Sequence, residues 1–265
     1  MKNLYLLVFT YSLLLSSTNY KIISLTPSIT ETLYLLGETK NVVGITSFCK
    51  RISKEQRIVG TYIEPNIEEI IKINPDIVFI SKEGTKKETV EKLKKFNINV
   101  VIFEPVNNYK EIKYQFLYIS KILKKEKTAK DILRKYEASF RQKTKKYTGK
   151  KILCILSLNP LIVASDKSYI GDIIKNSGGI NPVISQIKYP SISLEELLKI
   201  NPEIIIIPEM GINKKEIERF FIRFKNLNAA KNNRIYVLPS DVLCQPNVKN
   251  YFLSVQKISK ILEEK

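Results

Sequence analysis

The chain has 265 residues, 44% of them apolar, which is enough for one large domain or for two lobes with buried cores. Its 44 basic and 26 acidic residues give a net charge of +18. Lysine is spread along the whole chain, without zinc-finger spacing or an aromatic RNA-binding strand. We therefore favour a solvated, lysine-rich surface over a nucleic-acid-binding module.

Histidine is absent from the sequence, and its absence excludes several kinds of site. Ser–His and Cys–His nucleophile pairs, histidine-ligated zinc and imidazole-ligated haem all require it. No Walker loop is present, and no GxGxxG motif follows a strand. An exported enzyme that works with carboxylates alone is the alternative, with Glu64 and either Asp241 or Asp166 as its candidate residues.

The N-terminal residues have the pattern of a secretory signal peptide. Lys2 precedes an apolar stretch from Leu4 to Leu15, and small polar residues follow at 16–19. The stretch is too short to span a bilayer, which takes about 20 apolar residues. We predict a signal peptide at 1–18 and a periplasmic protein without a lipid-anchor cysteine; an uncleaved anchor is the alternative.

The first lobe is predicted at residues 20–124. Ser28 and Glu31 suggest a capping box for its first helix, which Gly37 ends. The expected elements are strand 21–25, a helix up to Gly37, strand 42–46, helix 67–73, strand 76–80, helix 86–96, strand 99–104 and a helix ending at 119–123. Continuous apolar strands alternating with helices predict an α/β fold with mainly parallel sheets.

A second lobe is predicted at 149–265, because the sequence repeats. "NIEEIIKINPDIVFI" at 66–80 returns at 193–207 as "SLEELLKINPEIIII", with eight of fifteen letters identical. The segment "ISKIL" ends a helix in each half. A repeat of this length indicates two similar lobes rather than a solenoid. The other expected elements are strands at "KILCILSL", "LIVAS" and 234–239, a helix from Tyr169 to Gly178, a helix near 214–226 and a last helix ending at 258–262.

Capping explains one of the two adjacent glutamates at the start of each repeated helix. Asn66 and Ser193 are expected to be N-caps, and Glu69 and Glu196 to close capping boxes. Glu68 and Glu195 then remain as further acids of the first helical turn.

The lobes are expected to be joined by one long helix at 125–148. Ala129, Ile132, Leu133, Tyr136 and Phe140 form one apolar stripe at helical spacing. A helix of this length is stiff, unlike a Gly/Ser linker. We therefore predict a ligand cleft between the lobes.

The chain resembles the helical-backbone periplasmic binding proteins that serve ABC importers of cobalamin and iron–siderophore complexes. The resemblance lies in "KIISLTPSITETLYLLG", "VVGIT", the two copies of the repeat, "SYIGDIIKNSGGINPV" and "RIYVLPSDVL", in that order. It implies two lobes with a spanning helix, no catalysis and no cofactor of the protein's own. It further implies a monomer that delivers its ligand to an ABC permease dimer.

The resemblance, closest to the cobalamin-binding branch, also suggests ligand residues. Phe48 stands where that branch has an aromatic residue, Tyr62 and Tyr189 where it has tryptophans, and Asp241 where it has a polar contact. Gln245 lies in the segment "VLCQPNVK", which lacks the arginines of many members. Because anionic ferric siderophores usually pair with Arg, we favour a corrinoid, with a ferric siderophore as the alternative.

Two other features follow from the resemblance and from the cysteines. Glu68 and Glu195 match the glutamates with which the family docks against arginines of the permease, and Ile162 departs from the phenylalanine of the cobalamin branch. Three cysteines leave at least one unpaired. Cys154 is expected to be a buried thiol, and a disulfide between Cys49 and Cys244 is left open.

Overall fold

The computed structural model describes residues 20–141, 148–209 and 211–264, and these fall into two compact units. The first unit comprises residues 20–105 and 115–131, and the second comprises 106–114 and the described residues from 132 onward. The predicted signal peptide and most of the last turns of the predicted spanning helix lie outside the described residues. Within those residues, no helix is long and apolar enough to cross a membrane.

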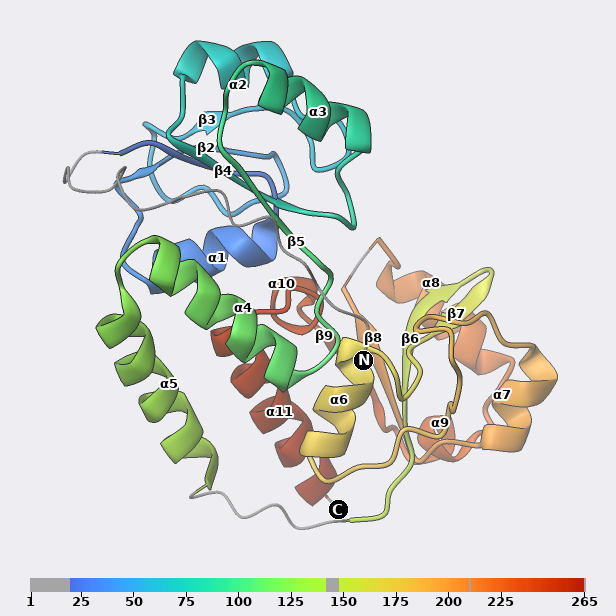
Figure 1. Cartoon of the computed structure of the whole chain (residues 1–265). Coiled ribbons are helices and arrows are strands. Elements are labelled where there is room, and N and C mark those ends of the chain that lie inside the picture. The colour runs from blue at the N-terminus through green and yellow to red at the C-terminus, as the bar shows by residue number, and fades with distance from the viewer. Residues whose placement is uncertain (1–19, 142–147, 210, 265) are drawn as a thin grey trace. The chain divides into compact units, whose positions relative to one another are not determined.

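The first unit is built on a five-stranded parallel sheet in the order β3-β2-β1-β4-β5. Its core combines strand residues such as Ile23, Val78 and Ile80 with Ile70 of α2 and Leu93 of α3. In Figure 1, α2 and α3 lie together beside this sheet. The elements are β1 Ile22–Ser24, α1 Pro27–Leu35, β2 Val42–Ile45, β3 Arg57–Ile58, α2 Ile67–Ile73, β4 Ile77–Ser81, α3 Lys87–Lys95 and β5 Val100–Phe103.

The first helix begins differently from the prediction. Its N-cap is Thr26, and Pro27 occupies the first helical position, where a missing N–H costs nothing. Ser28 therefore lies inside the helix, and the predicted capping box of Ser28 with Glu31 is wrong. The Thr26 hydroxyl does not cap either, because it accepts a hydrogen bond from the Ser81 backbone N–H at 3.0 Å. Gly37 follows the helix with φ +85°, as expected of a residue that ends one.

The second unit contains a four-stranded sheet in the order β7-β6-β8-β9. Strands β6, β8 and β9 are parallel, whereas β7 returns antiparallel to β6 through a tight hairpin. The α/β class with mainly parallel sheets is thus confirmed. The elements are β6 Ile152–Leu158, β7 Leu161–Val163, α6 Tyr169–Asn176, α7 Leu194–Ile200, β8 Ile204–Pro208, α8 Lys214–Ile222, α9 Asn228–Lys231, β9 Ile235–Leu238, α10 Ser240–Leu243 and α11 Val248–Glu263.

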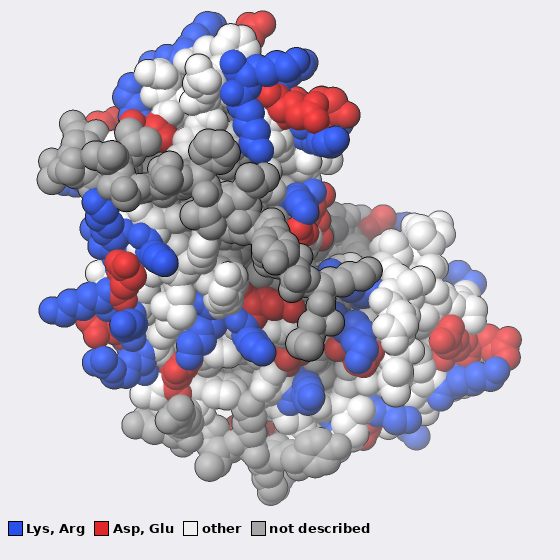
Figure 2. Space-filling view, viewed as in Figure 1, with Lys and Arg blue, Asp and Glu red and all other residues white. Residues whose placement is uncertain are grey.

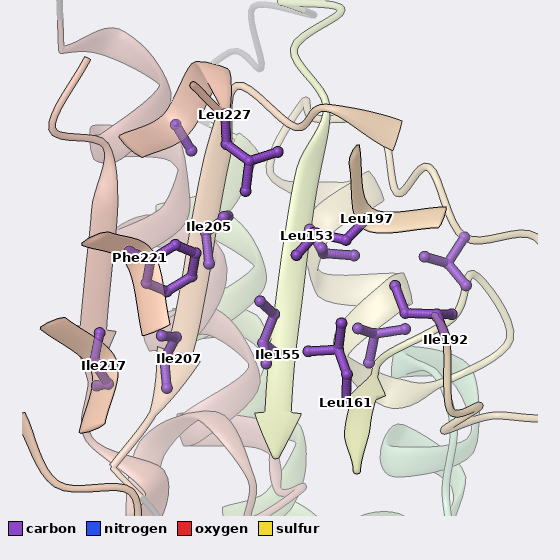
Figure 3. Close-up of a cluster of buried hydrophobic side chains, with 13 residues drawn as sticks. Leu153, Ile155, Leu161, Ile192, Leu197, Ile205, Ile207, Ile217, Phe221 and Leu227 are labelled. Carbon is purple, nitrogen blue, oxygen red and sulfur yellow. The ribbon is translucent and has the colours of Figure 1, made fainter. Parts of the chain in front are cut away.

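Each face of the second sheet has its own apolar layer. Figure 3 shows Leu153 and Ile155 of β6 with Ile205 and Ile207 of β8, packed against side chains from α7 and α8. Alternation along a strand sends the neighbouring residues to the other face. There Ile152 reaches Gly179, where an added Cβ would lie 2.6 Å from its Cδ1. Helices α6 and α11 pack together as the second unit's other layer.

The repeated segments form the same corner in both units. Asn66 and Ser193 each accept a hydrogen bond from the backbone N–H of the third helical residue, at 3.1 and 3.0 Å. The N-cap predictions are confirmed. The reciprocal bonds, from the N-cap backbone N–H to the Glu69 and Glu196 carboxylates, are not found among the described residues, so the predicted boxes are only half formed. A complete capping box instead starts α8, at Asn213.

The end of each repeated helix is also the same. Asn74 and Asn201 take left-handed conformations, with φ of 50° and 43°, and end α2 and α7. A proline follows each, then an acid that binds the chain just ahead of the first strand of its unit. Asp76 accepts the Lys21 N–H at 2.7 Å, and Glu203 accepts the Lys151 N–H at 2.5 Å. This bond fixes the register of β4 on β1 and of β8 on β6.

Two helices contribute to both units. The division passes through α4, Tyr109–Ile122, and through α5, Glu126–Arg141. The start of α4 is fastened inside the second unit, because Asp172 accepts the Tyr109 N–H at 3.0 Å and the Tyr251 hydroxyl at 2.8 Å. The rings of Tyr109 and Tyr251 stack with their centroids 4.9 Å apart. The domain boundaries expected from the sequence stay a prediction.

The left-handed corner allows a stability test. Replacing Asn74 by Ala should lower the free energy of unfolding by about 1 kcal/mol, because Ala tolerates positive φ poorly, whereas Gly should be neutral. Asn201→Gly should be destabilising, because the Asn201 side chain also accepts the Asn228 N–H at 2.8 Å. Urea unfolding of the variants measures both. Equal stability of Asn74→Ala and Asn74→Gly would contradict this account of the corner.

Candidate ligand and docking sites

Loops after parallel strands gather at the carboxyl edge of a sheet, where α/β proteins usually bind ligands. In the first unit, β2 is followed by a turn closed by the Cys49 N–H, which donates to the Thr46 carbonyl at 3.0 Å. Both ends of this turn are buried, and the Cys49 thiol lies 3.1 Å from the Thr46 hydroxyl. Phe48 sits between them with 66% of its surface exposed. The fold fastens the turn and leaves an apolar ring in solvent.

The loop after β3 lies beside this turn and carries Tyr62. The Ser47 N–H donates to the Gly60 carbonyl at 2.9 Å, which joins the two loops. Gly60 has φ +96°, and a Cβ there would lie 2.6 Å from the Asn66 nitrogen, so this tight turn requires glycine. Tyr62 is half-buried, and burial, followed by the charge of Glu83, raises the pKa of its phenol. The structure therefore brings Phe48 and Tyr62 to one edge of one sheet.

In the second unit, Asp241 and Gln245 follow β9 at the carboxyl edge. Asp241 is exposed in the short helix α10. The side-chain amide of Asn250 donates to the carbonyls of both Asp241 and Gln245, at 2.8 and 3.1 Å. Asn250 is itself buried. The two residues are thus brought together on a segment that α11 holds in place.

Tyr189 is at the opposite edge of the same sheet. Residues 188–192 run beside β7, with hydrogen bonds from Ser165 N–H to the Lys188 carbonyl and from Val163 N–H to the Pro190 carbonyl. In the order β7-β6-β8-β9, the segment of Tyr189 therefore borders one edge strand, whereas Asp241 follows the other. Tyr189 is 40% exposed. Its assignment as a ligand residue stays a prediction.

One polar group that the sequence analysis missed is the phenol of Tyr169, at the start of α6. It is buried, and its hydroxyl has no hydrogen-bond partner within the described part of the chain. Burial, then the charges of Cys244 and Tyr189, raises the pKa of this phenol. Its only sequence signal was its place directly after Ser168, which caps α6.

The candidate docking glutamates are exposed on the first turns of α2 and α7. The equivalent lysines of the two helices form ion pairs with glutamates at different helical positions. Lys72 pairs with Glu69 at 3.0 Å, whereas Lys199 pairs with Glu195 at 2.9 Å. Glu68 and Glu195 nevertheless occupy the same helical position, next to the N-cap-bonded residue. Their docking role stays a prediction.

The carboxylates nominated for an exported enzyme have structural partners. Glu64 is exposed and pairs with Lys86 at 3.5 Å. Asp166 accepts the Ser185 N–H at 3.2 Å and pairs with Lys167 at 3.3 Å. Burial opposes ionisation of Asp166, but the Ser185 N–H and Lys167 outweigh it and lower its pKa. A carboxyl with a lowered pKa is a poor general acid.

Charge and metal-binding groups give no competing site in the described residues. Figure 2 shows Lys and Arg interspersed with Asp and Glu over the visible face. No group of three or more His, Cys, Asp or Glu side chains could hold a metal ion in the part of the chain that the structure describes. The interspersed charges fit the solvated surface expected from the sequence.

The sequence matches the periplasmic binding protein family over residues 22–242. The chain therefore belongs to this family and is a substrate-binding protein. The resemblance noted from the sequence motifs is confirmed at the level of the family.

Three relatives illustrate the range of that family. The heme uptake protein IsdE of Staphylococcus aureus is 28% identical over 84% of this chain and 80% of its own length. Its heme complex superimposes with a TM-score of 0.75 over 93% of this chain and 100% of IsdE, at 25% identity. The ABC transporter substrate-binding lipoprotein YvrC of Bacillus subtilis is 24% identical over 84% of this chain and 74% of its own. The vitamin B12-binding protein BtuF of Vibrio cholerae has a TM-score of 0.76 at 21% identity, covering 92% of this chain and 96% of BtuF.

The cysteines provide a test of the cores. All three are free thiols, so the disulfide left open between Cys49 and Cys244 is not formed in the structure. Burial raises the pKa of Cys244 to about 12 and that of Cys154 well above its usual range. At pH 8 we expect a thiol reagent to label the native protein slowly and to titrate three thiols in denaturant. Rapid labelling of the native protein, or fewer than three thiols in denaturant, would overturn this.

Proposed function

We propose that the chain captures a metal-chelate tetrapyrrole, with a corrinoid as the first candidate, for delivery to an ABC importer. The observation that carries the proposal is the exposed Phe48 ring on a turn that is hydrogen-bonded to the Tyr62 loop, at the carboxyl edge of the first sheet. An apolar ring on a fastened turn gains free energy when a flat, partly apolar ligand covers it. Asp241 and Gln245 would supply polar contacts from the second unit. The predicted cleft between the lobes stays a prediction.

The absence of histidine favours a corrinoid over haem. A corrinoid can retain its own axial base, so no imidazole from the protein is required. Haem is the second candidate, because the heme uptake protein IsdE is similar over most of the chain; a tyrosine would then have to take the place of an imidazole ligand. A ferric siderophore is disfavoured because the segment 242–249 contains no arginine.

The site is proposed to bind without catalysis, in a protein exported to the periplasm. The family supports export, and the apolar N-terminal stretch is the expected signal. The relative YvrC is named a lipoprotein. The absence of a lipid anchor therefore stays a prediction.

Glu68 and Glu195 are proposed to dock the protein on the two halves of a permease dimer. They occupy the same position on the first turns of the two repeated helices, α2 and α7, and both are exposed. A duplicated acid on a surface with net positive charge gives a local attraction for arginines and fixes the register of binding.

The ligand assignment is tested by spectral titration. Cobalamin, cobinamide, haem and ferric siderophores should be compared, with the expected order beginning at the corrinoids. Phe48→Ala combined with Tyr62→Ala should weaken binding by about 1–3 kcal/mol, because aromatic contact area is lost. Phe96→Ala is the matched control, since Phe96 is a 59% exposed phenylalanine of the same unit that follows α3. Unchanged titration curves for the double variant would refute the site.

Docking is tested by charge reversal. Glu68→Arg with Glu195→Arg should keep ligand affinity and unfolding free energy near those of the parent. Transport, or stimulation of permease ATPase, should fall at least about tenfold, because attraction becomes repulsion. The control pair is Glu88→Arg with Glu218→Arg, which reverses one exposed glutamate elsewhere in each unit. Transport that survives the first pair, or fails equally in both pairs, would refute docking through these residues.

A further inference from the structure

The Tyr62 ring lies away from β3, the strand that precedes Tyr62 in the chain. β3 is the edge strand, and β2 and β1 separate it from β4. The Tyr62 ring nevertheless reaches the loop that follows β4. A Cβ built on Gly84 would lie 2.6 Å from Tyr62 Cδ1, and closer still to Cε1 and Cζ. These three ring atoms are the nearest atoms to the position that a side chain at 84 would take.

Other contacts join the same two loops. The Lys86 ammonium pairs with the Glu64 carboxylate at 3.5 Å, two residues beyond each partner of the Gly84–Tyr62 contact. At the base of the Tyr62 loop, the Thr61 N–H donates to the Glu64 carbonyl at 3.1 Å, and the Glu64 N–H donates to the Thr61 hydroxyl at 2.9 Å. The backbone of this loop is therefore held, and the ring has a defined place only if residue 84 lacks a side chain.

We propose that Gly84 is a positioning residue for ligand binding: its bare backbone seats the Tyr62 ring across the carboxyl end of β4. The ring is then preorganised at the same edge of the sheet as Phe48, so that binding a flat ligand costs little side-chain entropy. This rests on the proposed function for the ligand, although the seating of the ring does not. Gly84 is not among the glycines with positive φ, so an alanine there meets the ring without backbone strain.

The pKa of the Tyr62 phenol shows whether the ring occupies its place at Gly84, independently of any ligand. Burial raises the pKa of this phenol, and the charge of Glu83 raises it further. Hydrogen bonding with the Ser81 side chain lowers it. Lys82, Lys86 and Glu64 are the other charged groups at these loops. Lys82 pairs with Glu104, and Lys86 pairs with Glu64. Displacing the ring into solvent removes the largest of these effects, so the pKa should fall toward 10.

The experiment combines Gly84→Ala with Tyr62→Ala. Tyrosine NMR at the ζ carbon, assigned by loss of one signal in Tyr62→Phe, gives the phenol pKa, and titration with cobinamide gives the affinity. Gly84→Ala should lower the Tyr62 pKa and weaken binding at least about tenfold. In the Tyr62→Ala background, Gly84→Ala should have no further effect, because the two residues act as one. Thr85→Ala, which removes a hydroxyl with no partner among the described residues, is the control and should change neither quantity.

The outcomes separate this inference from the proposed function. An unchanged Tyr62 pKa in Gly84→Ala, or equal losses of affinity in both backgrounds, overturns the positioning role. A lowered pKa with no effect of Tyr62→Ala on affinity supports the seat and instead refutes the ligand site. If Gly84→Ala alone fails to fold, the double variant should recover the parent's melting temperature, because the methyl group then has no ring to meet. Failure of the double variant to recover would also overturn the inference.

Discussion

The corner between a short helix and a buried strand is the constraint on which both units depend. In each copy an asparagine in the left-handed conformation stops the helix, a proline prevents its continuation, and an acid binds the backbone ahead of the first strand. The carboxylate of the acid, together with the acid's own backbone N–H, which donates to the Lys21 or Lys151 carbonyl, holds the register of two parallel strands. Because β4 and β8 are wholly buried, a register slip would expose a row of branched apolar side chains.

This scaffold places the two proposed tasks close together in the first unit and leaves the corner apart from both. Glu68 and Glu195 lie on the first turns of α2 and α7, and α2 begins directly after the Tyr62 loop, whereas the corner lies at the other end of each helix, ahead of β4 or β8. The candidate ligand residues Phe48, Tyr62, Asp241 and Gln245 follow strands at their carboxyl ends. Parallel strands place all loops of one kind on one edge. The candidate ligand loops can therefore change in sequence without disturbing the corners at the amino ends of β4 and β8.

Much of this was predictable from the sequence, because the signals were local. The repeated letters predicted two similar lobes, and Asn66 and Ser193 were identifiable N-caps with the observed hydrogen bonds. The failures involve partners far apart in the chain. Thr26 rather than Ser28 is the N-cap of α1, and its hydroxyl accepts a hydrogen bond from the Ser81 N–H, 55 residues away, instead of capping the helix. The Gly84 seat for Tyr62 and the attachment of Tyr109 to Asp172 likewise have no sequence pattern. Exposed aromatic residues such as Phe48 were found only through resemblance to a family.

The account is tested most directly by hydrogen–deuterium exchange of the free and the cobinamide-loaded protein. If the carboxyl-edge loops hold the ligand, protection should increase at residues 46–49, 60–65 and 239–247, and the backbone amides of the corners at 73–77 and 200–204 should exchange at unchanged rates. Protection concentrated at 73–77 and 200–204, with none at 46–49 and 60–65, would contradict the assignment of ligand binding to the carboxyl ends of the strands.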